Sequence, residues 1–215
     1  MQLPLSLPSQ PPRFTRDAFQ IAEANEEAWK TAMVWMESGA PSLVITGPPQ
    51  SGKSHLATII VDATNGTFIS GDHLCAGDWP SGPLIGLDDI PRTTNPHDLL
   101  TGISMARADQ KRIVLVCSGA QEDWSGGLTD LQTRLSAMPR ASLGEPDEEL
   151  LKKVMEKQFH DRQISIAQSV IDFAALRIKR TFKAVSTFVD HVDNASLAQK
   201  KPITIQVAKT IIEAL

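Results

Sequence analysis

The stretch that most constrains the fold is GPPQSGKS, which runs from Gly47 to Ser54. It fits the pattern GxxxxGK[ST], and it stands between the apolar run PSLVITG and the helix-forming run KSHLATIIVDA. Glycines at both ends let several backbone N–H groups turn toward one phosphate, beside the positive end of a helix. The stretch therefore predicts a phosphate-binding loop between a buried strand and a helix.

In such a loop Lys53 reaches the β- and γ-phosphates, and the hydroxyl of Ser54 binds Mg²⁺. His55 is a candidate neighbour of the α-phosphate or the base, and equally a candidate helix-surface residue. Five histidines without paired spacing predict no metal site of their own. The residues expected at the nucleotide are Gly47, Pro48, Pro49, Gln50, Ser51, Gly52, Lys53, Ser54 and His55.

A second signal is PLIGLDDI, an apolar strand that ends in Asp88 and Asp89. Two acids after a strand are more often turn residues when they stand alone. Behind a phosphate loop, Asp88 is expected to hold the magnesium shell together with Ser54. Asp89 is expected to orient the attacking water, so both carboxylates are candidate catalytic residues.

The arrangement of apolar runs predicts two domains. GTFIS, PLIGLDD and KRIVLVCSG are further short apolar runs, separated by segments of helical length. Strands that alternate with helices indicate crossover connections, and hence a parallel sheet covered on both faces, over residues 13–143. After Leu143 no strand is expected. In GEPDEELLKKVMEKQF we place Pro146 in the first helical turn, and apolar residues recur there every four positions, so residues 144–215 are predicted to form a small all-helical domain.

The composition excludes several classes of protein. The formal net charge is -4, which argues against a dedicated nucleic-acid binder with a basic face. No apolar run approaches the roughly 18 residues of a membrane span. Cys75 and Cys117 lie in apolar surroundings without CxxC spacing, so we expect reduced cysteines in a cytoplasmic protein that contacts no membrane.

Four stretches resemble the AAA+ ATPases of the DnaA type and, within them, the short Hda-like proteins. They are GPPQSGKSHL at the loop, NEEAW ahead of the first strand, LTDLQTRL, and VDHVDNASLAQKKPITI near the end. The resemblance implies an α/β P-loop AAA+ domain with a parallel sheet, followed by a small helical lid. It also implies ADP or ATP with Mg²⁺ as the ligands, and homo-oligomers are compatible with it.

By this resemblance Arg134 in LQTRL is the arginine finger, which acts on a nucleotide held by a neighbouring subunit. The alternative is a surface arginine in a weak salt bridge. Lys183 in RTFKAV stands where the lid usually carries a sensor arginine, and Arg180 could substitute. Lysine lacks the planar fork of arginine, and Ser118 and Gly119 donate little at the other sensor position, so weak intrinsic hydrolysis is expected.

The resemblance implies a function as well. We expect a regulator that triggers ATP hydrolysis on the replication initiator DnaA and so limits re-initiation. Initiators of that type continue into a helix-turn-helix domain, whereas this sequence stops at Leu215 as the last lid helix ends, so no direct sequence-specific DNA binding is expected. The alternatives are a P-loop nucleotide kinase, and an AAA+ helper ATPase that loads or recruits proteins on DNA.

The first residues read MQLPLSLPSQPPRF. Prolines interrupt this segment too often for a secretory signal or a core strand, which leaves a disordered terminus or an extended docking segment. In Hda-like proteins, a glutamine followed by alternating leucines resembles the motif that docks on the DNA polymerase sliding clamp. The resemblance therefore implies a flexible clamp-binding tail over residues 1–12, with contacts from Gln2, Leu3, Leu5 and Leu7.

Overall fold

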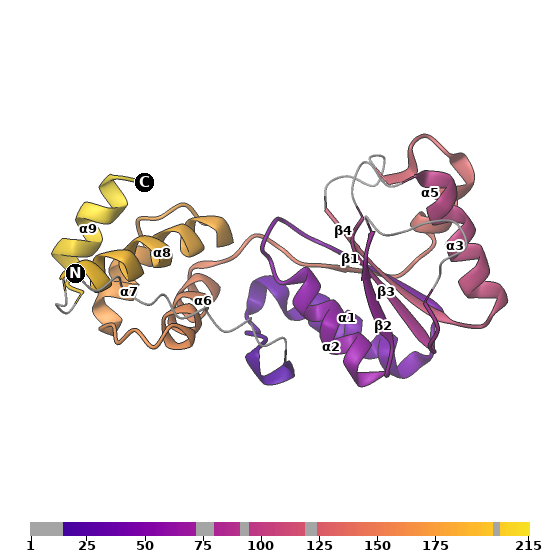
Figure 1. The fold of residues 1–215 in the computed structure, drawn as a ribbon, viewed down its shortest axis with the longest axis horizontal. Coiled ribbons are helices and arrows are strands. Elements are labelled where there is room, and N and C mark those ends of the chain that lie inside the picture. Colours follow the sequence, from indigo (N-terminus) through magenta and orange to yellow (C-terminus); the bar gives the residue numbers. More distant parts are fainter. Residues whose placement is uncertain (1–14, 72–79, 91–94, 119–123, 200–202) are drawn as a thin grey trace, which may run out of the picture. The chain divides into compact units, whose positions relative to one another are not determined.

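The computed structural model describes residues 15–71, 80–90, 95–118, 124–199 and 203–215 (Figure 1). The tail over residues 1–12, including Gln2, Leu3, Leu5 and Leu7, lies outside the described residues, as do Cys75 and Gly119. The contacts divide the rest of the chain into two compact units, with the boundary between Pro146 and Asp147.

The first unit is built on a five-stranded sheet in the order β2-β3-β4-β1-β5. Each pair of neighbouring strands is parallel. The prediction of a parallel α/β sheet is therefore confirmed, and the short strand β5 is added to the four apolar strands expected from the sequence. The strands are β1 (Ser42–Thr46), β2 (Thr67–Ser70), β3 (Leu84–Ile90), β4 (Arg112–Cys117) and β5 (Arg140–Ser142).

Helices cover both faces of this sheet (Figure 1). Side chains alternate between the faces of a strand, so Leu43 and Ile45 of β1 pack in one core with α1 and α2, while Val44 packs in the other with α3 and α5. Both cores are continuous, as a sheet buried on two sides requires. The helices are η1 (Arg16–Ala18), α1 (Glu23–Ser38), α2 (Lys53–Ala63), α3 (Pro96–Ala108) and α5 (Thr129–Ser136).

Asn25 of the NEEAW stretch has a clear local role. Its Oδ1 accepts a hydrogen bond from Ala22 N (2.9 Å), and its Nδ2 donates to Gln20 O (2.8 Å). The side chain is 5% exposed, so the amide joins the first turn of α1 to the segment ahead of it. This asparagine therefore fixes how the chain enters α1.

The second unit is all-helical, as predicted, and consists of α6 (Glu148–Asp161), α7 (Gln168–Ala175), α8 (Phe182–Gln199) and α9 (Ile205–Glu213). Leu151, Met155 and Phe159 of α6 are buried in its core. The expectation that Pro146 lies in the first turn of α6 is wrong. Asp147 is the N-cap, because its Oδ1 accepts from Leu150 N (2.7 Å), and Pro146 comes one residue earlier.

No helix in the described parts of the chain combines the length and apolarity that crossing a bilayer requires.

Candidate nucleotide-binding site

The phosphate loop connects β1 to α2 within the first unit. Gln50 (φ 63°) and Gly52 (φ 92°) adopt left-handed backbone conformations, as a loop that curls around an anion requires. At Gly47 a Cβ would lie 2.8 Å from Cβ of Leu143 and 2.8 Å from Oγ of Ser51. Gly47 is therefore needed for close packing, because the chain that continues from β5 passes directly beside it.

Lys53 is the first residue of α2, and its side chain curls back into the loop. It is 7% exposed, and Nζ donates to Gly47 O (3.1 Å) and Pro48 O (2.9 Å). Burial lowers the pKa of Lys53, although the charges of Asp89 and Asp88 oppose that shift. The loop thus holds a largely desolvated amine next to two carboxylates, where anionic oxygens would interact with it strongly.

The two predicted carboxylates lie at a β-bulge in β3. Leu87 pairs with Leu115 and Ile90 pairs with Cys117, so two residues of β3 lie opposite one residue of β4. Asp89 has a positive φ of 43°, an unusual conformation for a residue other than glycine. The bulge interrupts the strand's alternation of side chains, so that two consecutive acids occupy the carboxyl end of the sheet.

Ser54 and Asp88, the two candidate magnesium ligands, meet at this edge of the sheet. Oγ of Ser54 donates to Oδ1 of Asp88 (2.9 Å), which also accepts from the backbone N of Asp89 (2.9 Å). Asp89 lies 3.4 Å from the donating hydroxyl of Ser118. The structure thus brings together the loop serine, both acids and the end of β4.

These residues fit a nucleotide with magnesium. Mg²⁺ is usually held by one or two protein oxygens together with phosphate oxygens, and the Ser54–Asp88 pair offers such oxygens. No cluster of three or more His, Cys, Asp or Glu side chains occurs in the described residues, so a site built from protein side chains alone is not found there. In addition, Oγ of Ser51 is buried in the loop and has no hydrogen-bond partner among the residues that the structure describes. The loop therefore holds a polar group that a ligand could satisfy.

His55 is not a plain helix-surface residue. Its Nε2 lies 2.9 Å from Thr15 O, and its ring packs edge-on against Phe19 at 5.2 Å between ring centroids. Phe19 stacks in turn on Trp29, with 5.2 Å between the ring centroids. A Cβ added at Gly52 would lie 3.4 Å from the Phe19 ring. The segment before α1 therefore lies against the phosphate loop.

Sequence reasoning missed Thr15 and Phe19. A conspicuous aromatic residue shortly before the first helix was the available signal. Nothing in the local pattern, however, indicates which distant loop Phe19 packs against.

Arg134 lies on α5, and its recorded partners are on α5 and α3. Its Nε donates to Oδ1 of Asp130 (3.2 Å), and its Nη1 donates to Oγ of Ser104 (3.1 Å). The side chain is 33% exposed, and that of Asp130 is 60% exposed. Arg134 is therefore a partly exposed arginine, held by a weak surface pair on the face of the sheet opposite α1 and α2 (Figure 1).

The two candidate sensor residues belong to the second unit. Lys183 lies in the first turn of α8, Arg180 precedes that helix, and both are exposed. In the described parts of the chain, neither side chain has a recorded ion pair. The choice between them stays a prediction.

The comparisons with known proteins bear on both units. The family model for the Hda lid domain matches residues 147–212, which is the helical unit. Domain III of the Thermotoga maritima replication initiation protein DnaA has a similar structure over 95% of this chain and 97% of that chain, with a TM-score of 0.78 and 18% identity. The chain therefore shares the fold of DnaA domain III, and its helical unit matches the Hda lid family.

Two further solved structures share this fold. Replication initiator DnaA bound to AMPPCP and single-stranded DNA is similar over 88% of this chain and 69% of that chain, with a TM-score of 0.69 and 15% identity. The Thermotoga maritima RuvB Holliday junction branch migration motor is similar over 94% of this chain and 72% of that chain, with a TM-score of 0.71 and 19% identity. No curated protein sequence matches the chain significantly.

Proposed function

We propose that the chain is a nucleotide-dependent regulator of the initiator DnaA, on which it stimulates ATP hydrolysis. One observation carries the proposal. The phosphate loop, with its Ser54–Asp88 pair, precedes a helical unit that matches the Hda lid model. A nucleotide site joined to that lid favours a regulator over a P-loop nucleotide kinase.

In this proposal the loop binds ADP or ATP with Mg²⁺. The backbone N–H groups of residues 50–52 and the amine of Lys53 would hold the phosphates. Ser54 and Asp88 would hold the metal, and Asp89 would orient a water molecule. Bound magnesium would supply positive charge against the phosphate oxygens. His55, which contacts Phe19 and Thr15, would border the nucleotide.

Arg134 is the residue proposed to act in trans. Its guanidinium is partly exposed, and its ion pair with Asp130 is exposed and therefore contributes little to stability. It can therefore be released toward a nucleotide held by the initiator, where it would offset the charge that develops during phosphoryl transfer.

An AAA+ helper ATPase remains the second candidate, because RuvB motors share the fold. The two functions differ in where ATP is hydrolysed. The test is to add the wild-type chain to DnaA loaded with labelled ATP and to follow ADP formation on the initiator. Faster hydrolysis on DnaA supports the regulator, whereas hydrolysis that depends only on this chain supports a helper ATPase.

Intrinsic hydrolysis is expected to be slow. Lys183 offers one point charge where arginine would grip two oxygens, and the residues after β4 include few strong donors. We expect the purified chain to turn over below about 1 s⁻¹, the low end of ordinary enzymes. Steady-state phosphate release, measured with saturating ATP and Mg²⁺, checks this expectation, and a faster rate would contradict it.

We also propose that the tail docks on the sliding clamp through Gln2, Leu3, Leu5 and Leu7. Prolines restrict a segment before it binds, so little ordering entropy is lost in a groove. Gln2→Ala combined with Leu3→Ala is expected to abolish clamp capture in a surface-binding assay and to leave ADP affinity unchanged. Gln10→Ala is the matched control, and equal capture by the double variant and the wild type would refute the proposal.

A further inference from the structure

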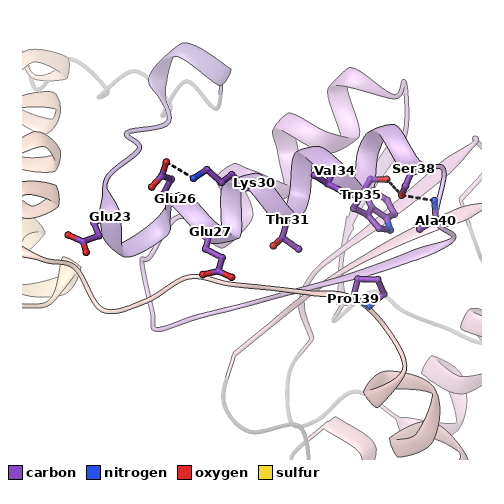
Figure 2. A pocket seen from close by; sticks show the side chains of 10 residues that line it. All are labelled: Glu23, Glu26, Glu27, Lys30, Thr31, Val34, Trp35, Ser38, Ala40 and Pro139. Atoms are coloured by element: carbon purple, nitrogen blue, oxygen red, sulfur yellow. Dashed lines mark hydrogen bonds and ion pairs between the residues drawn. The ribbon is translucent and has the colours of Figure 1, made fainter.

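An open groove of about 610 Å³ lies along α1, beside the segment that leads into β5 (Figure 2). Its apolar part includes Val34, which is 65% exposed, and Pro139. Its acidic part is formed by Glu23, Glu26 and Glu27, all from the first turns of α1. We call this surface the acidic groove, and it is lined by Glu23, Glu26, Glu27, Lys30, Thr31, Val34, Trp35, Ser38, Ala40 and Pro139.

The charges in the acidic groove are only partly compensated. Glu26 pairs with Lys30 (2.7 Å), but no ion pair of Glu23 or Glu27 is recorded among the described residues. An apolar surface bordered by uncompensated carboxylates favours a partner with an apolar side chain flanked by cations.

Trp35 adds a second observation at the acidic groove. It is 3% exposed, and its Nε1 has no hydrogen-bond partner in the described parts of the chain. In Figure 2 the indole nitrogen points toward Pro139, at the edge of the groove. The Arg112 guanidinium packs over the Trp35 ring, 3.9 Å from the ring centroid, and helps to fix its position. A buried donor without an acceptor is costly, so a carbonyl from a docked segment would stabilise this site.

The second unit carries a surface of the opposite character. We call it the basic turn, and it spans residues 176–183 between α7 and the start of α8. Leu176 is 64% exposed, and the exposed cations around it are Arg177, Lys179, Arg180 and Lys183. In the described residues none of these cations has a recorded ion pair with an acid.

One cation of the basic turn is held in a fixed position. The Arg177 guanidinium lies 3.8 Å from the centroid of the Phe173 ring, and its Nη1 donates to Phe173 O (3.1 Å). Arg177 is therefore ordered before any partner binds, so docking there costs less side-chain entropy.

The two surfaces match each other in apolarity and in charge. Val34 and Leu176 have the largest exposed fractions among the large hydrophobic side chains in the described parts of the chain. Acids surround the first and cations surround the second. We propose that the basic turn of one copy of this protein docks in the acidic groove of a second copy, with Leu176 against Val34 and Lys179 near Glu27.

This contact joins two different surfaces, so it is heterologous, and it can extend from copy to copy. Both surfaces are small, which places the contact among weak, transient interfaces. Its charge pairs are exposed, so salt should weaken it strongly. The proposal goes beyond the nucleotide-dependent function. Arg180 and Lys183 of the basic turn are the candidate nucleotide sensors, so the test instead uses Glu27 and Lys179, which lie outside the nucleotide site.

Sedimentation of the full chain tests the proposal. At low ionic strength the wild type is expected to show a mass that rises with concentration, and in about 1 M salt, where the Debye length is about 3 Å, it should be monomeric. Glu27→Lys and Lys179→Glu should each weaken association about tenfold or more, because like charges then face each other. The control Glu37→Lys makes the same change on α1 outside the groove and should associate like the wild type.

Mixing the variants provides the decisive comparison. An equimolar mixture of Glu27→Lys and Lys179→Glu should regain association, because each variant keeps the surface that the other has lost. All these positions are exposed, and thermal melting verifies that the variants fold. A wild type that stays monomeric at every concentration overturns the proposal. So do single variants that associate normally, or a mixture that stays monomeric.

Discussion

Replacing Lys53 with alanine is expected to abolish measurable binding of both ADP and ATP. Lys53 is the only formal positive charge in the phosphate loop, and it is nearly removed from water. Truncating one partner of a desolvated charge pair costs about 2–5 kcal/mol, which is a loss of roughly thirtyfold to several thousandfold in affinity. Calorimetric titration with each nucleotide and Mg²⁺ measures the effect.

The same substitution is expected to leave the fold intact. Among the described residues, the recorded hydrogen bonds of the Lys53 amine go to the carbonyls of Gly47 and Pro48, and burial of the amine penalises its charged form. Because its pKa is lowered in the folded state, this penalty is present at neutral pH and disappears as pH rises toward the ordinary value of 10.5. The nucleotide-free Lys53→Ala variant should therefore melt no earlier than the wild type at neutral pH, and any advantage should shrink at alkaline pH.

A matched control separates the site from general charge effects. Lys30→Ala removes another lysine of the same unit, one whose ammonium is exposed and paired with Glu26. It should bind both nucleotides normally. If Lys53→Ala kept wild-type affinity for ADP and ATP, the loop would not be the nucleotide site.

Much of this site could be predicted because its chemistry is local. The two glycines, Lys53 and Ser54 lie within one short pattern, and their roles follow from backbone conformation and charge. Asp88 could be added because it ends an apolar strand that follows the phosphate loop in the sequence. In the structure its Oδ1 accepts a hydrogen bond from Oγ of Ser54.

The parts that were missed depend on contacts between distant segments. Strand β5 has three residues, of which only Ala141 is buried, so it carries no apolar run that would reveal it. The bulge at Asp88 and Asp89 depends on how β3 pairs with β4. The packing of Phe19 on His55 joins residues far apart in sequence, and no periodicity marks it.

In the helical unit, too, one feature could be predicted from the sequence and another could not. The spacing of Leu151, Met155 and Phe159 predicted a helix with one buried face, and all three are buried. The start of that helix was predicted less well, because both Pro146 and Asp147 suit a helix N-terminus. The hydrogen bond from Leu150 N to Asp147 makes Asp147 the N-cap, so Pro146 lies before the helix and not in its first turn.

Arg134→Ala is expected to keep nucleotide binding and to lose stimulation of ATP hydrolysis by DnaA by about 10³-fold or more, the effect of removing an arginine finger that acts in trans. The measurement is the rate of ADP formation on the initiator at matched concentrations of variant and wild type. Arg134→Lys keeps the charge but loses the planar fork, so it should restore only part of the rate.

A loss of stimulation in Arg134→Ala has a competing explanation, in which Arg134 only stabilises the fold through its surface contacts. The same contacts provide a test that separates the two explanations. If the residue only joins α5 to α3 through Ser104, its loss should lower thermal stability, and Asp130→Asn should impair stimulation as well. If it is a finger, Asp130→Asn should keep full stimulation, because breaking an exposed pair releases the guanidinium at little cost. Arg107→Ala, which removes an exposed arginine from α3, controls for charge. Full stimulation by Arg134→Ala would show that Arg134 is a surface residue and that the activity resides elsewhere.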